Sequence, residues 1–160
     1  MDYLSALPHQ PPMRLLDEVT DVEPGRRCRA ARRTRATDFF FDGHFPGTPV
    51  VPACILIEMI AQAGGIAAVS GGPPEPIQLR VAAFGPCRFP AAAGVNASLE
   101  IDARVAGQIG GLYKIEGQVR AAGVLVASGE VTLARPREDS RSSAMSDRAA
   151  EAGRQETPGC

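Results

Sequence analysis

The sequence has almost no net charge and few histidines and cysteines, and each scarcity argues against a class of function. The formal net charge is −1, so no overall positive field favours nucleic acid as a partner. The four cysteines, at positions 28, 54, 87 and 160, show neither metal-ligand spacing nor a dense disulfide framework. The N-terminus lacks the basic start and apolar run of a signal peptide. We therefore expect a cytoplasmic protein without a metal or other cofactor.

The longest apolar stretch, residues 53–69, predicts a buried helix. A length of 160 residues and a hydrophobic content of 44% predict one domain with one core. Apolar groups occur on every side of a 3.6-residue turn in this stretch, and Pro52 marks its start. Glu58 and Gln62 within it argue against a membrane span. A central core helix is the better interpretation, with no membrane as a partner.

Glu58 is the only charged side chain of this predicted helix. Burial of a carboxylate among isoleucines costs several kcal/mol unless the group is paired. A functional role is therefore favoured over a structural ion pair or hydrogen bond. Gln62 lies four residues later on the same helical face, where it either orients the carboxyl group or is simply a satisfied polar side chain.

His44 lies in the loop that precedes the helix. Residues 43–49 contain two glycines and two prolines, so the backbone is sharply bent and loses little freedom on folding. Such a loop holds an imidazole in a fixed place. His9, the other histidine, lies in a proline-bounded turn with no acidic or nucleophilic residue spaced to act with it, so we predict a structural role for it.

Several segments alternate apolar and polar residues with the period of two that is typical of antiparallel strands. Strands are predicted at 14–22, 26–36, 77–89, 95–106, 113–120 and 124–134. A long buried helix among them implies an α+β fold with a curved sheet around the helix. A sheet of so few strands leaves an open edge, which predicts dimerisation.

The composition changes after residue 135. Residues 136–160 contain no aromatic or branched aliphatic side chain, so burial of apolar area cannot offset the entropy of ordering them. We expect one domain over residues 1–135 and a disordered tail over residues 136–160.

The stretch GHFPGTPVVPACILIEMIAQ, residues 43–62, is similar to the signature of the β-hydroxyacyl-acyl carrier protein dehydratases, G-H-F-P-G-x-P-x-x-P-G-x-x-x-x-E-x-x-A-Q. LPHQPPMRLLDEV near the N-terminus and residues 88–119 resemble other parts of that family. The resemblance implies the hot-dog fold and dehydration of 3-hydroxyacyl thioesters to trans-2-enoyl thioesters, in fatty-acid or polyketide-like biosynthesis. It also implies an acyl carrier protein, with a phosphopantetheine-linked acyl chain, as a partner.

Roles for individual residues follow from this resemblance. His44 is expected to be the base toward C2, and Glu58 to assist loss of the hydroxyl group from C3. The helix start at Ala53 and Cys54 offers backbone N–H groups and the positive end of the helix dipole to the thioester oxygen. In the family, the histidine and the acid of one site come from different subunits of a dimer. An acyl tunnel is expected along the helix, although core packing explains its four candidate residues equally well: Phe45, Val51, Ile55 and Met59.

Two positions bear on the type of reaction. Ala53 replaces a glycine that is usual in the family, and its methyl group adds bulk beside the thioester. Cys54 resembles the subclass that also isomerises the double bond, whereas a glutamate at position 58 resembles the plain dehydratases. We favour dehydration alone.

Two other functions remain open. A hot-dog thioesterase would use Glu58 to direct water at the acyl carbon and would not require His44. A non-catalytic acyl-binding subunit of a hetero-oligomer would rely on a partner for the chemistry. The six arginines within residues 26–36 either form a solvated strand that discourages edge pairing or, less favoured, a docking surface for an acidic carrier protein.

Overall fold

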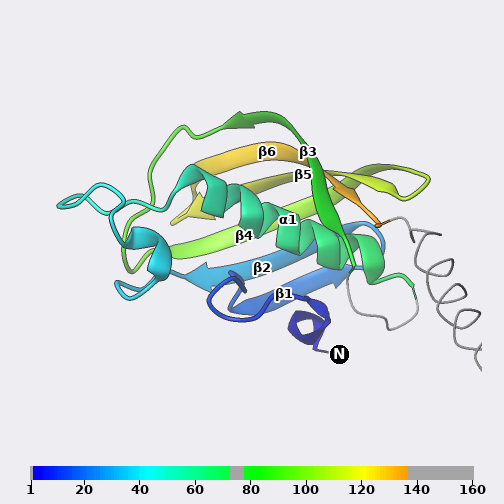
Figure 1. Ribbon diagram of the computed structural model, residues 1–160, viewed down its shortest axis with the longest axis horizontal. Helices are drawn as coiled ribbons and strands as arrows, with labels where there is room; N and C mark the ends of the chain where they lie inside the picture. Colours follow the sequence, from blue (N-terminus) through cyan, green and yellow to red (C-terminus); the bar gives the residue numbers. More distant parts are fainter. Residues whose placement is uncertain (1, 73–77, 137–160) are drawn as a thin grey trace, which may run out of the picture.

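The computed structural model describes residues 2–72 and 78–136 (Figure 1). The elements in chain order are η1 (Tyr3–Ala6), β1 (Glu18–Glu23), β2 (Arg27–Arg33), η2 (Phe39–Phe41), α1 (Ala53–Val69), β3 (Arg80–Arg88), β4 (Ser98–Ile109), β5 (Leu112–Ala121) and β6 (Val124–Ala134). The predicted disordered tail, from residue 137 onward, and the predicted strand residue Ile77 lie outside the described residues.

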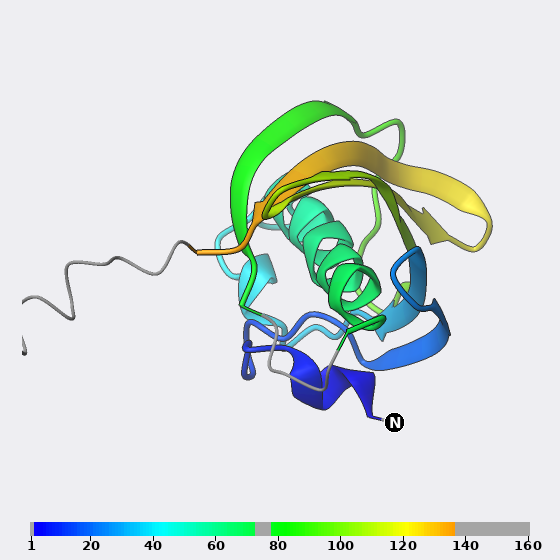
Figure 2. The ribbon, with the colours of Figure 1, turned by 90° about the vertical axis from the view of Figure 1, so that its right-hand side faces the viewer.

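The strands form one antiparallel sheet in the order β1-β2-β4-β5-β6-β3. Figure 2 shows this sheet curving around α1, with the N-terminal segment on the side of the helix that the sheet leaves open. The alternation expected in the sequence produces this arrangement, because the inward side chains of β2, β4, β5 and β6 face the helix. The predicted α+β hot-dog fold is confirmed.

Helix α1 has the bounds that the sequence predicts. Twelve of its 17 residues are buried, so the helix is covered on nearly all sides. Met59 and Ile60 are fully buried, as are Ile115 and Val131 on the facing strands. No helix within residues 2–72 and 78–136 is long and apolar enough to cross a membrane.

Glycines allow the helix and the sheet to approach closely. A Cβ atom on Gly64 of α1 would lie 2.4 Å from Cγ2 of Ile115 on β5. A Cβ atom on Gly117 of β5 would lie 2.5 Å from Cγ2 of Ile60 on α1. The absence of a Cβ atom at Gly64 therefore leaves room for Ile115, and its absence at Gly117 leaves room for Ile60.

Several predicted strand bounds are wrong by a few residues. The first strand begins at Glu18 and not at residue 14, because the N–H group of Leu15 donates to the side chain of Gln62 instead of to a strand. The second strand ends at Arg33, because a backbone hydrogen bond from Asp38 to Arg35 turns the chain. The strand predicted to end at residue 106 continues to Ile109, since the hairpin turn follows it.

Candidate active site

The loop that carries His44 joins η2 to α1 and projects beyond the sheet as the cyan segment of Figure 1. Its backbone adopts positive φ angles at Gly43 (73°), Phe45 (50°) and Gly47 (89°). Gly43 and Gly47 reach these angles at little cost because they have no Cβ atom. Two short-range hydrogen bonds brace the turns, from His44 N to Phe41 O (3.2 Å) and from Thr48 N to Phe45 O (3.0 Å).

The His44 imidazole is held in one tautomer. Nδ1 lies 3.0 Å from the carbonyl oxygen of Val50. A carbonyl oxygen only accepts hydrogen bonds, so Nδ1 carries a proton, and in the neutral imidazole Nε2 is the nitrogen with the free lone pair. The loop itself is fixed to the rest of the domain by the next residue, since Val51 N donates to Ala93 O at 2.8 Å. This arrangement fixes the imidazole ring, with Nε2 as the nitrogen that can accept a proton.

Glu58 lines a cavity of about 250 Å³ between α1, the N-terminal segment and β3. Its side chain is 24% exposed. The predicted burial of Glu58 is therefore only partial, because the cavity opens beside the helix at this position. The other lining residues are mostly apolar: Leu7, Pro8, His9, Ala61, Gln62, Gly65, Leu79, Arg80, Val81 and Leu133.

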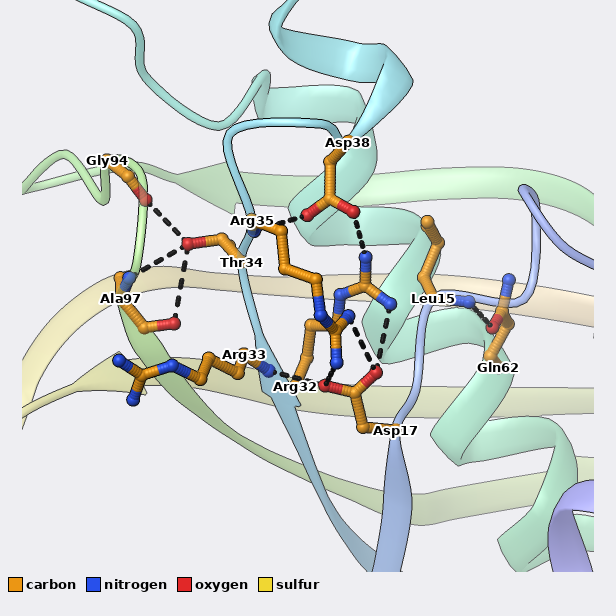
Figure 3. A network of polar contacts seen from close by, with 10 residues as sticks. All are labelled: Leu15, Asp17, Arg32, Arg33, Thr34, Arg35, Asp38, Gln62, Gly94 and Ala97. Atoms are coloured by element: carbon orange, nitrogen blue, oxygen red, sulfur yellow. Dashed lines mark hydrogen bonds and ion pairs between the residues drawn. The ribbon is translucent and has the colours of Figure 1, made fainter.

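Gln62 is fixed by the N-terminal segment and contacts the acid. Its Oε1 atom accepts from Leu15 N at 3.0 Å, and its Nε2 atom donates to Met13 O at 2.8 Å (Figure 3 draws Leu15 and Gln62). The same Nε2 donates to Glu58 Oε1 at 3.0 Å. The two backbone contacts determine which end of the amide is the donor, so Gln62 presents an N–H group to the carboxylate.

His9 also contacts the acid, which sequence reasoning missed. Its Nε2 atom lies 3.5 Å from Glu58 Oε1, so the expectation that His9 has no acidic neighbour is wrong. The two residues are far apart in the chain, and spacing along the sequence gives no indication of the contact. The available signal is that His9, one of only two histidines, lies in the N-terminal LPHQ motif that resembles the dehydratases.

Within one chain, His44 does not line the cavity that contains Glu58.

Ala53 and Cys54 are exposed at the start of α1. The first helical hydrogen bonds come after them, from Ile55 N and Leu56 N to Pro52 O. The N–H groups of Ala53 and Cys54 therefore have no acceptor within the helix. In the described part of the chain, no group of three or more His, Cys, Asp or Glu side chains is placed to hold a metal ion.

The four residues expected to line an acyl tunnel differ in how far they are exposed. Phe45 is 64% exposed in the projecting loop, whereas Val51, Ile55 and Met59 are buried in the core. None of them lines the cavity beside Glu58. That cavity extends along α1 in the direction of Gly65, toward the C-terminal half of the helix.

Five of the six arginines of β2 and its flanks pair with carboxylates, and the guanidinium of the sixth, Arg33, contacts Ser98 instead. Arg32 pairs with Asp17 (3.0 Å) and with Asp38, and the three residues connect β1, β2 and the segment that leads to η2 (Figure 3). Arg27 pairs with Asp102, which lowers the pKa of that carboxyl group through a direct hydrogen bond. Because these charges are largely neutralised, the structure favours the structural interpretation of the arginines over a carrier-protein docking surface.

A family model described as the FabA-like domain matches residues 7–130. The chain belongs to the FabA-like family. Among its relatives are two proteins named 3-hydroxyacyl-[acyl-carrier-protein] dehydratase FabZ. The one from Thiobacillus denitrificans is 34% identical over 78% of this chain and 88% of its own length. The one from Syntrophotalea carbinolica is 31% identical over 82% of this chain and 90% of its own length.

Solved structures support the fold of this FabA-like protein. The dehydratase heterocomplex ApeI:P from Xenorhabdus doucetiae contains a chain that matches with a TM-score of 0.71 at 20% identity, over 91% of this chain and 97% of that one. A hypothetical thioesterase from Streptococcus pneumoniae, solved with coenzyme A, matches with a TM-score of 0.60 at 11% identity, over 74% and 84% of the two chains. At these identities the likeness concerns the fold alone.

Proposed function

We propose that this FabA-like protein removes water from 3-hydroxyacyl thioesters, carried by an acyl carrier protein, to give trans-2-enoyl thioesters. His44 is the base and Glu58 the acid of the reaction. The two relatives named as dehydratases, which match over most of their length, support the substrate class.

The observation that carries the proposal is the hydrogen bond between His44 Nδ1 and Val50 O. It leaves Nε2 as a fixed proton acceptor, which abstraction of a C2 proton requires. A thioesterase that directs water with Glu58 would give this preorganised imidazole no role.

The chemistry follows from these positions. His44 Nε2 takes the proton from C2, and the electron pair of the C2–H bond moves toward the thioester oxygen to form an enolate. N–H groups at the start of α1, at Ala53 and Cys54, stabilise the negative charge on that oxygen. The enolate then expels the C3 hydroxyl group, which leaves as water with a proton from Glu58, and the C2–C3 double bond forms.

A dimer brings the two groups together in this proposal. In the described residues β3 pairs on one side only, with β6, and eight of its nine residues are exposed. Phe84 on this strand is 65% exposed, and Arg80 and Val81 line the cavity beside Glu58. A second copy paired along β3 would therefore lie next to the cavity and contribute its own His44 to it.

The first test measures interconversion of a short 3-hydroxyacyl thioester and its trans-2-enoyl product. We expect the natural protein to equilibrate the pair. His44→Ala and Glu58→Gln should each lose at least about a hundredfold in kcat, because each removes a group that transfers a proton. Release of free thiol by the natural protein and by His44→Ala would identify a thioesterase instead.

Mixing the two variants tests the shared site. Random exchange of subunits places one intact His44–Glu58 pair in each mixed dimer, so activity should return to about a quarter of the natural value. No recovery in demonstrably mixed dimers would mean that both groups act from one chain. A natural protein that is inert alone but binds the thioester would instead indicate a subunit that needs a different partner.

A further inference from the structure

Glu58 has two carboxylate oxygens, and the protein contacts them unequally. Oε1 accepts a hydrogen bond from Gln62 at 3.0 Å and lies 3.5 Å from His9 Nε2. Within the described residues, no hydrogen bond or ion pair involves Oε2. Oε1 therefore has protein groups on two sides, whereas Oε2 has no such contact among the described residues, and the Glu58 side chain lines the cavity.

Both groups on Oε1 are positioned by the N-terminal segment. Gln62 is fixed through Met13 and Leu15, and His9 lies two residues after Leu7, which is 4% exposed in the core. The His9 Nδ1 atom is buried and has no hydrogen-bond partner in the described part of the chain. The other nitrogen, Nε2, faces the carboxyl group of Glu58.

We propose that His9 is a positioning residue for Glu58, and this inference rests on the dehydratase function proposed above. Its Nε2–H group, with the Gln62 amide, holds Oε1 so that Oε2 is the oxygen that gives its proton to the leaving hydroxyl group. His9 itself exchanges no proton with the substrate. Loss of this contact leaves the carboxyl group free to rotate away from the geometry that proton transfer needs.

The experiment compares His9→Leu with His9→Gln in steady-state dehydration by the full-length protein. Leucine removes the N–H group, whereas the glutamine amide restores a donor near the place of Nε2. We expect kcat of His9→Leu to fall about tenfold or more with KM little changed, because binding is retained and orientation is lost. His9→Gln should recover most of kcat. Gln10→Leu, the same apolar change at the next and exposed residue, should match the natural protein.

The outcomes separate the two proposals. If the natural protein dehydrates the substrate and His9→Leu has the same kcat, the positioning role is wrong and the dehydratase function stands. The role is also wrong if His9→Gln loses as much kcat as His9→Leu, or if the loss follows a lowered melting temperature, since a purely structural residue would behave in that way. If the natural protein has no dehydratase activity, both proposals fail.

Discussion

Cys28 shows how the core changes the chemistry of a single residue. The side chain is fully buried on β2, and burial raises the pKa of its thiol to about 12, with a smaller contribution from the nearby charge of Asp102. A thiolate at this place would lose its hydration without gaining a cation. Cys28 is therefore an inert part of the core.

This raised pKa predicts a loss of stability at alkaline pH. An unfolded thiol releases its proton near pH 9, whereas the folded one keeps it to about pH 12. Below pH 9 the Cys28 thiol is protonated in the folded and the unfolded state alike. The stability that the buried thiol contributes is then fully retained. Between these values deprotonation favours the unfolded state, so the free energy of unfolding falls by up to about 1.4 kcal/mol per pH unit.

Urea unfolding at pH 8 and at pH 10.5 measures this effect. Cys28→Ala should be less stable at pH 8, because it leaves a cavity, yet should lose about 2 kcal/mol less than the natural protein on going to pH 10.5. Cys87→Ala, at a partly exposed thiol, serves as the control and should retain the natural slope. Equal slopes in all three proteins would contradict the assignment to Cys28.

At the scale of elements, the approach of α1 to β5 depends on Gly64. Alanine is the better helix former, by about 1 kcal/mol. Its Cβ atom would nevertheless overlap the fully buried Ile115. We expect Gly64→Ala to lower the free energy of unfolding by a net ~1–2 kcal/mol, because overpacking costs more than the gain in propensity.

A second substitution can show that the clash is the cause. Ile115→Ala removes both atoms nearest to the new methyl group, so Gly64→Ala should cost less in an Ile115→Ala background than in the natural protein, as measured by chemical denaturation. Gly107→Ala, with no neighbouring atom within 4 Å of the added Cβ, is the matched control and should be nearly neutral. Additive costs at positions 64 and 115 would disprove this explanation.

At the scale of the whole molecule, the edge strand β3 leads to a prediction about assembly. Phe84→Glu adds a charge to the strand that we propose pairs with a second copy. Because each proposed site needs both subunits, this variant should become largely monomeric and lose dehydratase activity in parallel. Light scattering and the dehydration assay at matched concentrations measure the two effects.

Val124→Glu is the matched control for this experiment. Val124 is also exposed, at 57%, but lies at the β5–β6 turn beyond the last residue of β6 that pairs with β3. The Val124→Glu protein should remain a dimer with natural activity. A fully active, dimeric Phe84→Glu protein would show that the subunits associate through another surface.

The sequence by itself determined the elements whose signals are local. The apolar run of residues 53–69 gave the bounds of α1, and the alternation at 99–105 gave the inward face of β4, where Leu99 and Ile101 are buried. The motif also singled out His44 and Glu58 as candidates. Helix and strand periodicity reflect interactions between near neighbours, so they can be read without the fold.

Only the tertiary structure decided what surrounds the acid. His9 and Leu15 reach Glu58 and Gln62 from 47 or more residues away because the N-terminal segment closes the side of α1 that the sheet leaves open. The cavity likewise extends toward Gly65 and not toward the predicted tunnel residues. These contacts depend on how far the sheet curves and where the chain crosses the helix, and no periodicity within a single segment encodes either quantity.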